Sequence, residues 1–405
     1  MTSIFKTSNA NIIICLALFS FMAGLISCED PGSVGEQFSD QNSEVIQDTL
    51  PAGPLDSIHV TSRSGGKPFS TAGIYSDQLF GNYEAIALIQ PGIGDIPVDT
   101  IANDIRVTTM RLDIIIDQSN IWGDTLSTVD YQLVEIAERW DESDWRFADS
   151  PSLTTKIVGE FSHQQADTVR VPLDSDWVER YINAFNMEPE MRDSTLAKEI
   201  FGFAVVPKNS GKLLPIDIDD TRLHINTTTT ANELNQVIRQ NATSLDRDQS
   251  PVFTDNGFEL SSTLNNSVAI SVDNVINNLR SPILSAAFLA LKQNDSLLAS
   301  SLPENHIRPS LNQTRLFLST AESVVDILKE GNRNRIGTVI PESPDNPRLE
   351  INITNNLQRF ISNPDSTVNI YLVYGSGNGL IRSSLYFGKA HREFPPSIFI
   401  TGLEP

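Results

Sequence analysis

The stretch Arg106-Val-Thr-Thr-Met-Arg-Leu-Asp-Ile-Ile-Ile116 decides the fold class. Leu112 and Ile114 alternate with Arg111 and Asp113, so one side of an extended chain is apolar and the other is polar. A two-residue period is typical of a strand that has one face on a core and one face in water. The stretch therefore predicts one layer of an antiparallel β-sandwich.

Similar short segments, bounded by Gly, Pro, Asn and Asp, recur along the chain. They lie at 85–90, 131–136, 168–173, 201–206 and 221–226. A strand–helix–strand rhythm is missing, which argues against a parallel α/β sheet. We expect an all-β protein with a few short helices.

A weak internal repeat gives the domain organisation. The order strand, short helix, strand, closing strand is expected at 168–174, 177–182, 201–206 and 221–226, and again at 348–354, 357–361, 368–374 and 396–401. At 405 residues the chain is also long enough for two cores. The repeat predicts two antiparallel, jelly-roll-like β-sandwich domains related by duplication, and chance similarity between amphipathic segments is the alternative.

Composition sets the expected boundaries. Residues 1–27 are expected to form a signal peptide and 28–54 an acidic flexible tether. The first sandwich is placed at 55–228 and the second at 256–405. The stretch between them, 229–255, is rich in Thr, Asn, Gln and Asp and is expected to be a linker or long loop.

The N-terminus carries an export signal. Lys6 precedes an apolar run at 12–26, which is too short for a comfortable transmembrane helix. The run ends in Leu25-Ile26-Ser27-Cys28, which resembles the lipobox of bacterial lipoproteins. The resemblance implies that Cys28 is lipidated and that three acyl chains anchor the chain in a membrane. A plain signal peptide with an incidental cysteine is the alternative.

The residues after Cys28 suggest where the anchor sits. From Glu29 to Leu50 there are six acids and no base. Acids directly after the lipid cysteine resemble the signal that sends Bacteroidota lipoproteins to the cell surface. The implied location is the outer membrane, with the chain lipid-anchored and surface-exposed, and an ordinary solvated linker is the alternative.

The net charge limits the partners. A formal charge of −22 repels nucleic acid, so we expect none to bind. The expected partners are the membrane, through the lipid anchor, and a polysaccharide or a surface protein.

Several motifs resemble known families. They are Tyr75-Ser-Asp-Gln-Leu-Phe-Gly81, the 106–116 strand, the segment 134–145, Trp177 and the strand 201–206. The first half resembles the DNRLRE-type jelly-roll domain, which is similar to some polysaccharide-binding modules. The whole chain is similar to a Bacteroidota outer-membrane lipoprotein family, the domain of unknown function 4270. Neither resemblance supplies catalytic residues.

The richest candidate site is Trp140-Asp-Glu-Ser-Asp-Trp145. Two indoles could stack on a sugar while Asp141, Glu142 and Asp144 accept its hydroxyls. Two carboxylates also occur in glycosidases. The competing hypothesis is a strand end with Trp140 packed in the core and Trp145 more exposed.

The sequence gives little support for a metal site or for catalysis. The five histidines are widely spaced, so no helix-borne zinc motif exists, and no catalytic or metal-ligating residues are assigned. The acids of Asp217-Ile-Asp-Asp220, or those near Asp141, are candidates for Ca²⁺, but an EF-hand pattern is missing, and no other cofactor is expected. We expect a non-enzymatic binding or structural module, with a polysaccharide-degrading hydrolase or lyase as the alternative.

Overall fold

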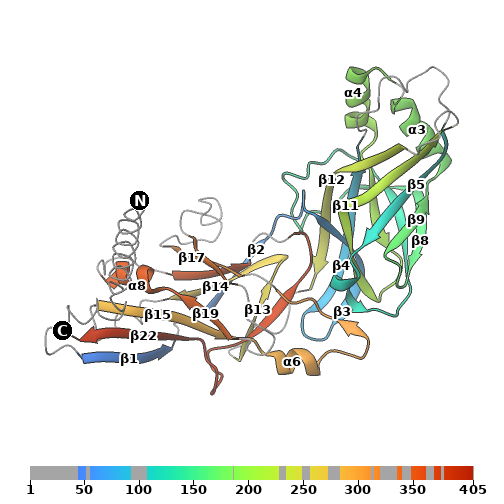
Figure 1. Cartoon of the computed structure of the whole chain (residues 1–405). Coiled ribbons are helices and arrows are strands. Elements are labelled where there is room, and N and C mark those ends of the chain that lie inside the picture. Colours follow the sequence, from blue (N-terminus) through green and yellow to red (C-terminus); the bar gives the residue numbers. More distant parts are fainter. Residues whose placement is uncertain are drawn as a thin grey trace, which may run out of the picture.

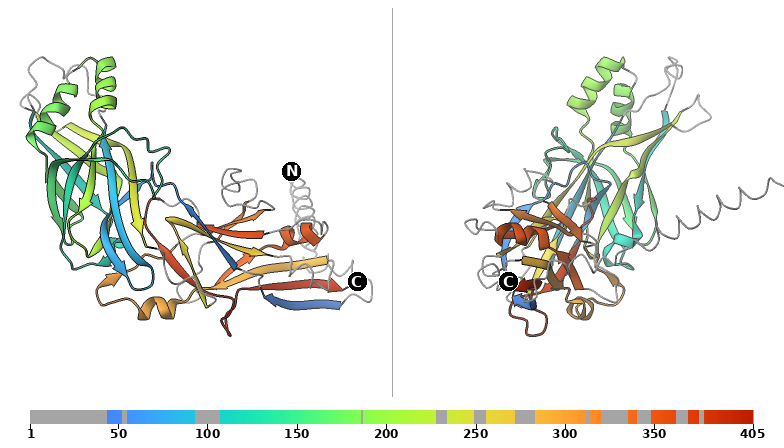
Figure 2. Two further views of the ribbon diagram at one scale, coloured as in Figure 1. Left: turned by 180° about the vertical axis from the view of Figure 1, so that it is seen from behind. Right: turned by 60° about the vertical axis from the view of Figure 1, so that its left-hand side comes forward.

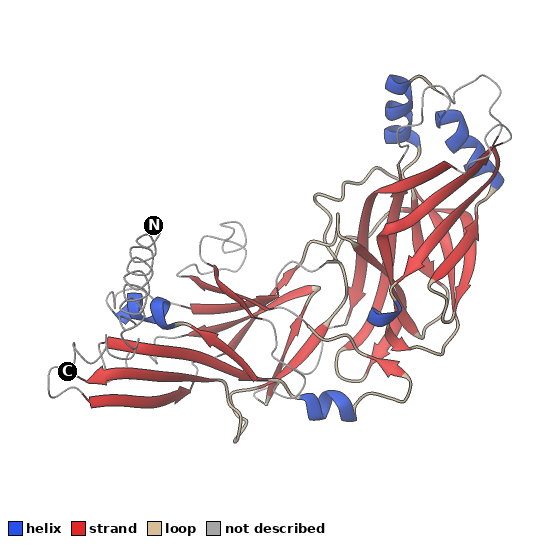
Figure 3. Ribbon diagram, viewed as in Figure 1, coloured by secondary structure: helices blue, strands red, loops and turns tan. Residues whose placement is uncertain are grey.

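The computed structural model describes most of the chain from Glu44 onward. The described residues are 44–51, 55–92, 107–185, 187–227, 234–248, 256–271, 283–311, 314–319, 335–339, 348–361, 369–374 and 378–404. The expected signal peptide and Cys28 lie outside them. Strands dominate, and every pairing is antiparallel apart from one parallel bridge between Ser261 and Asn265 (Figure 3). The all-β expectation is confirmed.

The strands form two lobes that meet at an angle in an elongated molecule (Figures 1 and 2). Lobe 1 contains β3 (Phe69–Asp77), β4 (Gly81–Pro91), β5 (Val107–Ile116), β6 (Trp122–Asp124), β7 (Val129–Ile136), β8 (Leu153–His163), β9 (Thr168–Pro172), β10 (Phe203–Pro207), β11 (Lys212–Thr227) and β12 (Leu234–Arg247). It also carries η2 (Gln118–Asn120), α3 (Ser175–Phe185) and α4 (Pro189–Glu199).

Lobe 2 is built mainly from the second half of the chain. It contains β1 (Glu44–Pro51), β2 (Leu55–Thr61), β13 (Gly257–Ser261), β14 (Leu264–Ser271), β15 (Ile283–Lys292), β17 (Thr314–Ser319), β18 (Arg335–Val339), β19 (Arg348–Asn352), α8 (Thr354–Ile361), β20 (Asn369–Tyr374), β21 (Ser383–Phe387) and β22 (Ser397–Glu404). Between the lobes run α6 (Asp295–Ser300) and β16 (His306–Ile307), and β16 pairs with β6 of lobe 1.

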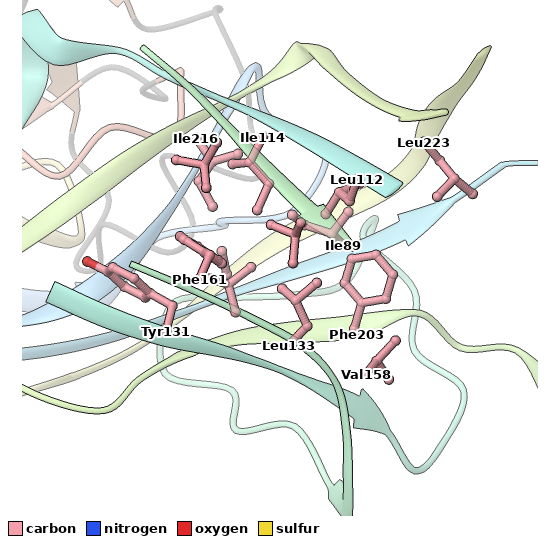
Figure 4. Close-up of a cluster of buried hydrophobic side chains, with 14 of the residues drawn as sticks. Ile89, Leu112, Ile114, Tyr131, Leu133, Val158, Phe161, Phe203, Ile216 and Leu223 are labelled. Carbon is pink, nitrogen blue, oxygen red and sulfur yellow. The ribbon is translucent and has the colours of Figure 1, made fainter. Parts of the chain in front are cut away.

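The alternation in β5 produces the core of lobe 1. Leu112 and Ile114 are fully buried, while Arg111, on the other face, remains partly exposed. Side chains from β4, β7, β8, β10 and β11 pack against this face (Figure 4). At one end of the sandwich, α3 places Trp177 and Tyr181 in the same cluster, with their rings stacked at 5.3 Å.

The two lobes share one topology. In lobe 1 the neighbours run β11-β5-β9 in one layer and β4-β10-β7-β8 in the other; in lobe 2 they run β22-β15-β19 and β14-β20-β17-β18. The N-terminal half of β11 pairs with β3, just as β21 pairs with β13. Helix α3 lies between β9 and β10 in the chain, and helix α8 lies between β19 and β20. Each helix therefore lies in the connection from one layer of its lobe to the other. The repeat predicted from the sequence therefore falls on equivalent elements.

The leading strand of each repeat pairs with strands of the other lobe. Strand β12 directly precedes the strands of lobe 2 in the chain. It nevertheless pairs with β11 and β4 of lobe 1. The equivalent segment of lobe 2 is β1–β2, in which β1 pairs with β22 and β2 pairs with β14. The repeats are thus β1–β11 and β12–β22, and their leading strands are exchanged.

This exchange corrects two expected segments. The range 229–255 is not a linker throughout, because Leu234–Arg247 is a strand of lobe 1. The range 28–54 is not a tether throughout, because Glu44–Pro51 pairs with the last strand of the chain. In addition, Leu55–Thr61, which was assigned to the first sandwich, belongs to lobe 2.

Two buried ion pairs hold the lobes together where the exchanged strands cross. The Arg308 guanidinium donates from Nε to Asp77 Oδ2 at 2.8 Å, and the two side chains are 5% and 0% exposed. Asp77 also accepts hydrogen bonds from the Trp122 indole and from two backbone N–H groups of its own turn. The second pair joins Arg247 of β12 to Glu259 of β13 at 2.8 Å, with both side chains 2% exposed.

Asp77→Ala should destabilise the protein strongly, because it leaves the Arg308 charge buried without a counter-ion. We expect a loss of about 3–5 kcal/mol in the free energy of unfolding, measured by urea titration. Lys208→Ala is the control, since it breaks the exposed Lys208–Glu160 pair and should cost less than about 1 kcal/mol. Equal losses for the two variants would contradict the structural role of Asp77.

Candidate functional site

The Trp140–Trp145 segment lies in the loop between β7 and β8, over the outer face of the lobe 1 sheet. Trp140 is 7% exposed and packs against Leu88, Ala204 and Ala242. Its Nε1 donates to the Phe201 carbonyl at 2.9 Å. The expectation that Trp140 is a core residue is confirmed.

Trp145 is only partly buried and packs edge-to-face on Trp140, with 5.8 Å between ring centroids. Because the two ring planes are inclined at 73°, the two rings do not form a flat, open platform of the kind that stacks on a sugar. Its Nε1 is buried without a hydrogen-bond partner in the described residues.

The three acids of the segment differ in exposure and in their hydrogen bonds. Asp141 is exposed and accepts the Ser143 N–H, which lowers the pKa of its carboxyl. Asp144 is exposed as well. Glu142 turns toward the sheet, where its Oε2 accepts the Asn241 N–H of β12 at 3.0 Å. Glu142 therefore fastens the loop to the exchanged strand.

The same loop also binds the backbone of both crossing segments. The Ser64 N–H donates to the Trp145 carbonyl, and the Phe147 N–H donates to the Ser62 carbonyl, both at 3.0 Å. On its other side, the Leu245 N–H of β12 donates to the Phe147 carbonyl at 2.6 Å. The loop thus connects the segment between β2 and β3 to strand β12.

A cleft of about 580 Å³ opens beside this loop, at the junction of the lobes. Its lining residues come from β4, β12 and the loop in lobe 1, and from β2 and the β13–β14 turn in lobe 2: Thr61, Glu84, Ile86, Phe147, Ala148, Ser150, Pro151, Ser244, Leu245, Asp246, Arg247 and Thr263. Seven of these twelve residues are polar or charged, so the cleft suits a polar ligand with some apolar surface.

Two carboxylates project from the sheet into this cleft. Glu84 of β4 and Asp246 of β12 are directly opposite each other in the antiparallel register, and both are exposed. Ser244 and Ile86 form the next pair on the same face. These residues were not predicted from the sequence, because Glu84 and Asp246 come together only through the pairing of β12 with β4.

Arg247, a cationic residue that lines the cleft, already interacts with other groups of the protein. Arg247 donates to Glu259 and to the Phe80 carbonyl, and its guanidinium lies 4.7 Å from the centre of the Tyr83 ring. Burial lowers the pKa of Arg247, but the interactions with Tyr83 and Glu259 outweigh it and raise that pKa above its ordinary value. The guanidinium therefore belongs to the junction and leaves the two carboxylates facing the cleft.

The Ca²⁺ candidate at Asp217–Asp220 has a structural explanation. The register between β11 and β5 shifts between Asp217 and Arg222, so these acids form a bulge. Asp217 Oδ1 accepts the Asp220 N–H, and burial raises the pKa of Asp217. In the part of the chain that the structure describes, no group of three or more His, Cys, Asp or Glu side chains is arranged to hold a metal ion.

Two other buried titratable groups lie in lobe 1, outside the cleft. His163 is 1% exposed, and burial together with the nearby charge of Lys212 lowers its pKa from 6.5 to about 4. Lys212 is fully buried and donates to the carbonyls of Ser127 and Gln164, and burial lowers its pKa. Both groups tie loops to the lobe 1 sheet.

Comparison with known proteins does not assign the chain to a family. No family profile and no curated protein matches it. Among solved structures it is similar to the collagen adhesin from S. aureus, at 9% identity and a TM-score of 0.14 over 82% of this chain and 85% of that one. It is also similar to the infectious bursal disease virus VP2 subviral particle, at 8% identity and a TM-score of 0.12 over 90% of this chain and 81% of that one.

Trp140→Ala should leave a cavity under the loop, because the indole fills the space between the loop and the sheet. We expect it to cost about 3–5 kcal/mol of stability by urea titration. Trp145→Ala should cost less, since that ring is partly exposed. A larger loss for Trp145 than for Trp140 would contradict this assignment of core and surface.

Stability should fall as the pH drops from about 6.5 toward 4. In this range the unfolded chain binds a proton on His163 that the folded chain, with its lowered pKa, does not bind. Urea midpoints at pH 7 and pH 4.5 should therefore differ less for His163→Gln than for the unchanged chain. Identical differences would show that His163 does not contribute.

Proposed function

We propose that the chain is a lipid-anchored, surface-exposed binding module of the outer membrane, and that lobe 1 is presented away from the membrane. The anchor is proposed from the resemblance of residues 25–28 to a lipobox, and the position of β1 supports the outward direction of lobe 1. In Figure 1, β1 lies in the part of lobe 2 remote from lobe 1 and runs toward the junction. Glu44, the first residue of β1, pairs with Glu404 at the end of β22.

This position supports a direction for the molecule relative to the proposed anchor. A chain lipidated at Cys28 enters the fold at β1, so lobe 2 is nearest to the membrane. Lobe 1 and the cleft at the junction then face outward, where a polysaccharide or a surface protein can reach them. The described residues contain no helix long and apolar enough to span a membrane.

The alternative is a polysaccharide-degrading enzyme, and the Glu84–Asp246 pair is the feature that favours it. Retaining glycosidases also use two carboxylates in a cleft. The general acid of such an enzyme sits in an environment that raises its pKa, usually by burial, whereas Glu84 and Asp246 are both exposed. We therefore favour binding, and release of reducing ends from a polysaccharide would support the alternative.

Cys28→Ser should release the protein from the membrane fraction, because the thiol that carries the first acyl chains is lost. Protease added to intact cells should cleave the unchanged protein, and permeabilising the cells should not be needed. Retention of Cys28→Ser in washed membranes would contradict the lipid anchor. Protection of the unchanged protein in intact cells would contradict surface exposure.

A further inference from the structure

The Glu84–Asp246 pair is unfavourable unless something positive binds to it. Side chains directly opposite each other in an antiparallel pair have Cβ atoms about 4.5–5.5 Å apart, and like charges at that separation repel. Within the described part of the chain, neither carboxylate makes an ion pair or a side-chain hydrogen bond. A neighbouring cation that could neutralise them, Arg247, is held by Glu259.

Ser244 adds a hydrogen-bonding group to the same cleft. Its side chain lies on the same face as the two carboxylates and is 8% exposed. Its hydroxyl lines the cleft and has no hydrogen-bond partner among the described residues. A donor or acceptor that enters the cleft would satisfy it.

The walls of the cleft add apolar surface beside these polar groups. Ile86 and Pro151 are partly exposed and line the cleft together with Ala148. This combination fits a long side chain with a hydrocarbon stem and a charged end, because the stem can pack on apolar atoms while its head reaches the carboxylates.

From this geometry we propose that the cleft binds an arginine or lysine side chain of a partner protein. The positive group lies between Glu84 and Asp246, and the stem lies along Ile86 and Pro151. A guanidinium can donate to both carboxylates at once. The inference rests on the proposed binding function and specifies its partner.

Other ligands match the cleft less well. A neutral sugar would leave the repulsion between the carboxylates in place. Ca²⁺ takes six to eight oxygen ligands, whereas the side chains of the cleft offer two carboxylates and a few hydroxyls. Both ligands are therefore outcomes of the test rather than parts of the proposal.

The test measures binding of the peptide Ac-Gly-Arg-Gly-NH₂ to the purified full chain by ligand-observed NMR. The peptide with citrulline in place of arginine has nearly the same shape without the charge, and it should not bind. Glu84→Gln with Asp246→Asn should weaken binding of the arginine peptide at least tenfold, and Ser244→Ala should weaken it less.

A matched control separates the cleft from the general acidity of the protein. Glu179→Gln with Glu190→Gln changes the net charge equally, at exposed positions on α3 and α4, and should leave binding within twofold of the unchanged chain. The cleft variants should also keep or raise the melting temperature, since they remove a repulsive pair.

Three results would overturn the proposal. They are equal binding of the arginine and citrulline peptides, unchanged binding in the cleft double variant, and binding of Ca²⁺ to the two carboxylates without binding of the peptide. None of these results depends on where the anchor sits, so they are distinct from a failure of the cell-fractionation experiment.

Discussion

The reciprocal exchange of leading strands is the constraint on which the rest of this structure depends. Neither lobe is complete without a strand from the other repeat: β12 closes lobe 1 between β11 and β4, and β1–β2 closes lobe 2 between β22 and β14. Two polypeptide connections must therefore cross between the lobes. Loss of either strand exposes a row of unpaired backbone groups on the lobe that it leaves.

The crossing explains the chemistry at the junction. Two arginine–carboxylate pairs are buried there, and such pairs are costly to break because removal of one partner leaves an unpaired charge. The crossing also creates the cleft, because Thr61 and Thr263 of lobe 2 line a hollow whose floor belongs to β4 and β12 of lobe 1. The features that hold the lobes together thus also shape the candidate binding site.

The sequence predicted the fold class because strands such as β5 carry a clear alternation of apolar and polar residues. It failed at β12 because that strand is unusually polar. Asn241 is 2% exposed and hydrogen bonds to the backbone of Lys67, and Thr243 is fully buried and accepts the Thr71 N–H. These buried polar side chains are satisfied by a neighbouring segment far away in the chain, so their composition resembles that of a linker. The cleft was hidden for the same reason, since no local pattern shows that Asp246 faces Glu84.

Cleavage of the connection between β12 and β13 tests the strand exchange most directly. A specific protease site placed within 249–255 would divide the chain into an N-terminal part ending after β12 and a C-terminal part beginning at β13. Our account predicts that the cleaved protein elutes from a size-exclusion column as one particle under native conditions, because β1–β2 remains paired in lobe 2. Elution of two separate folded fragments would contradict the exchange.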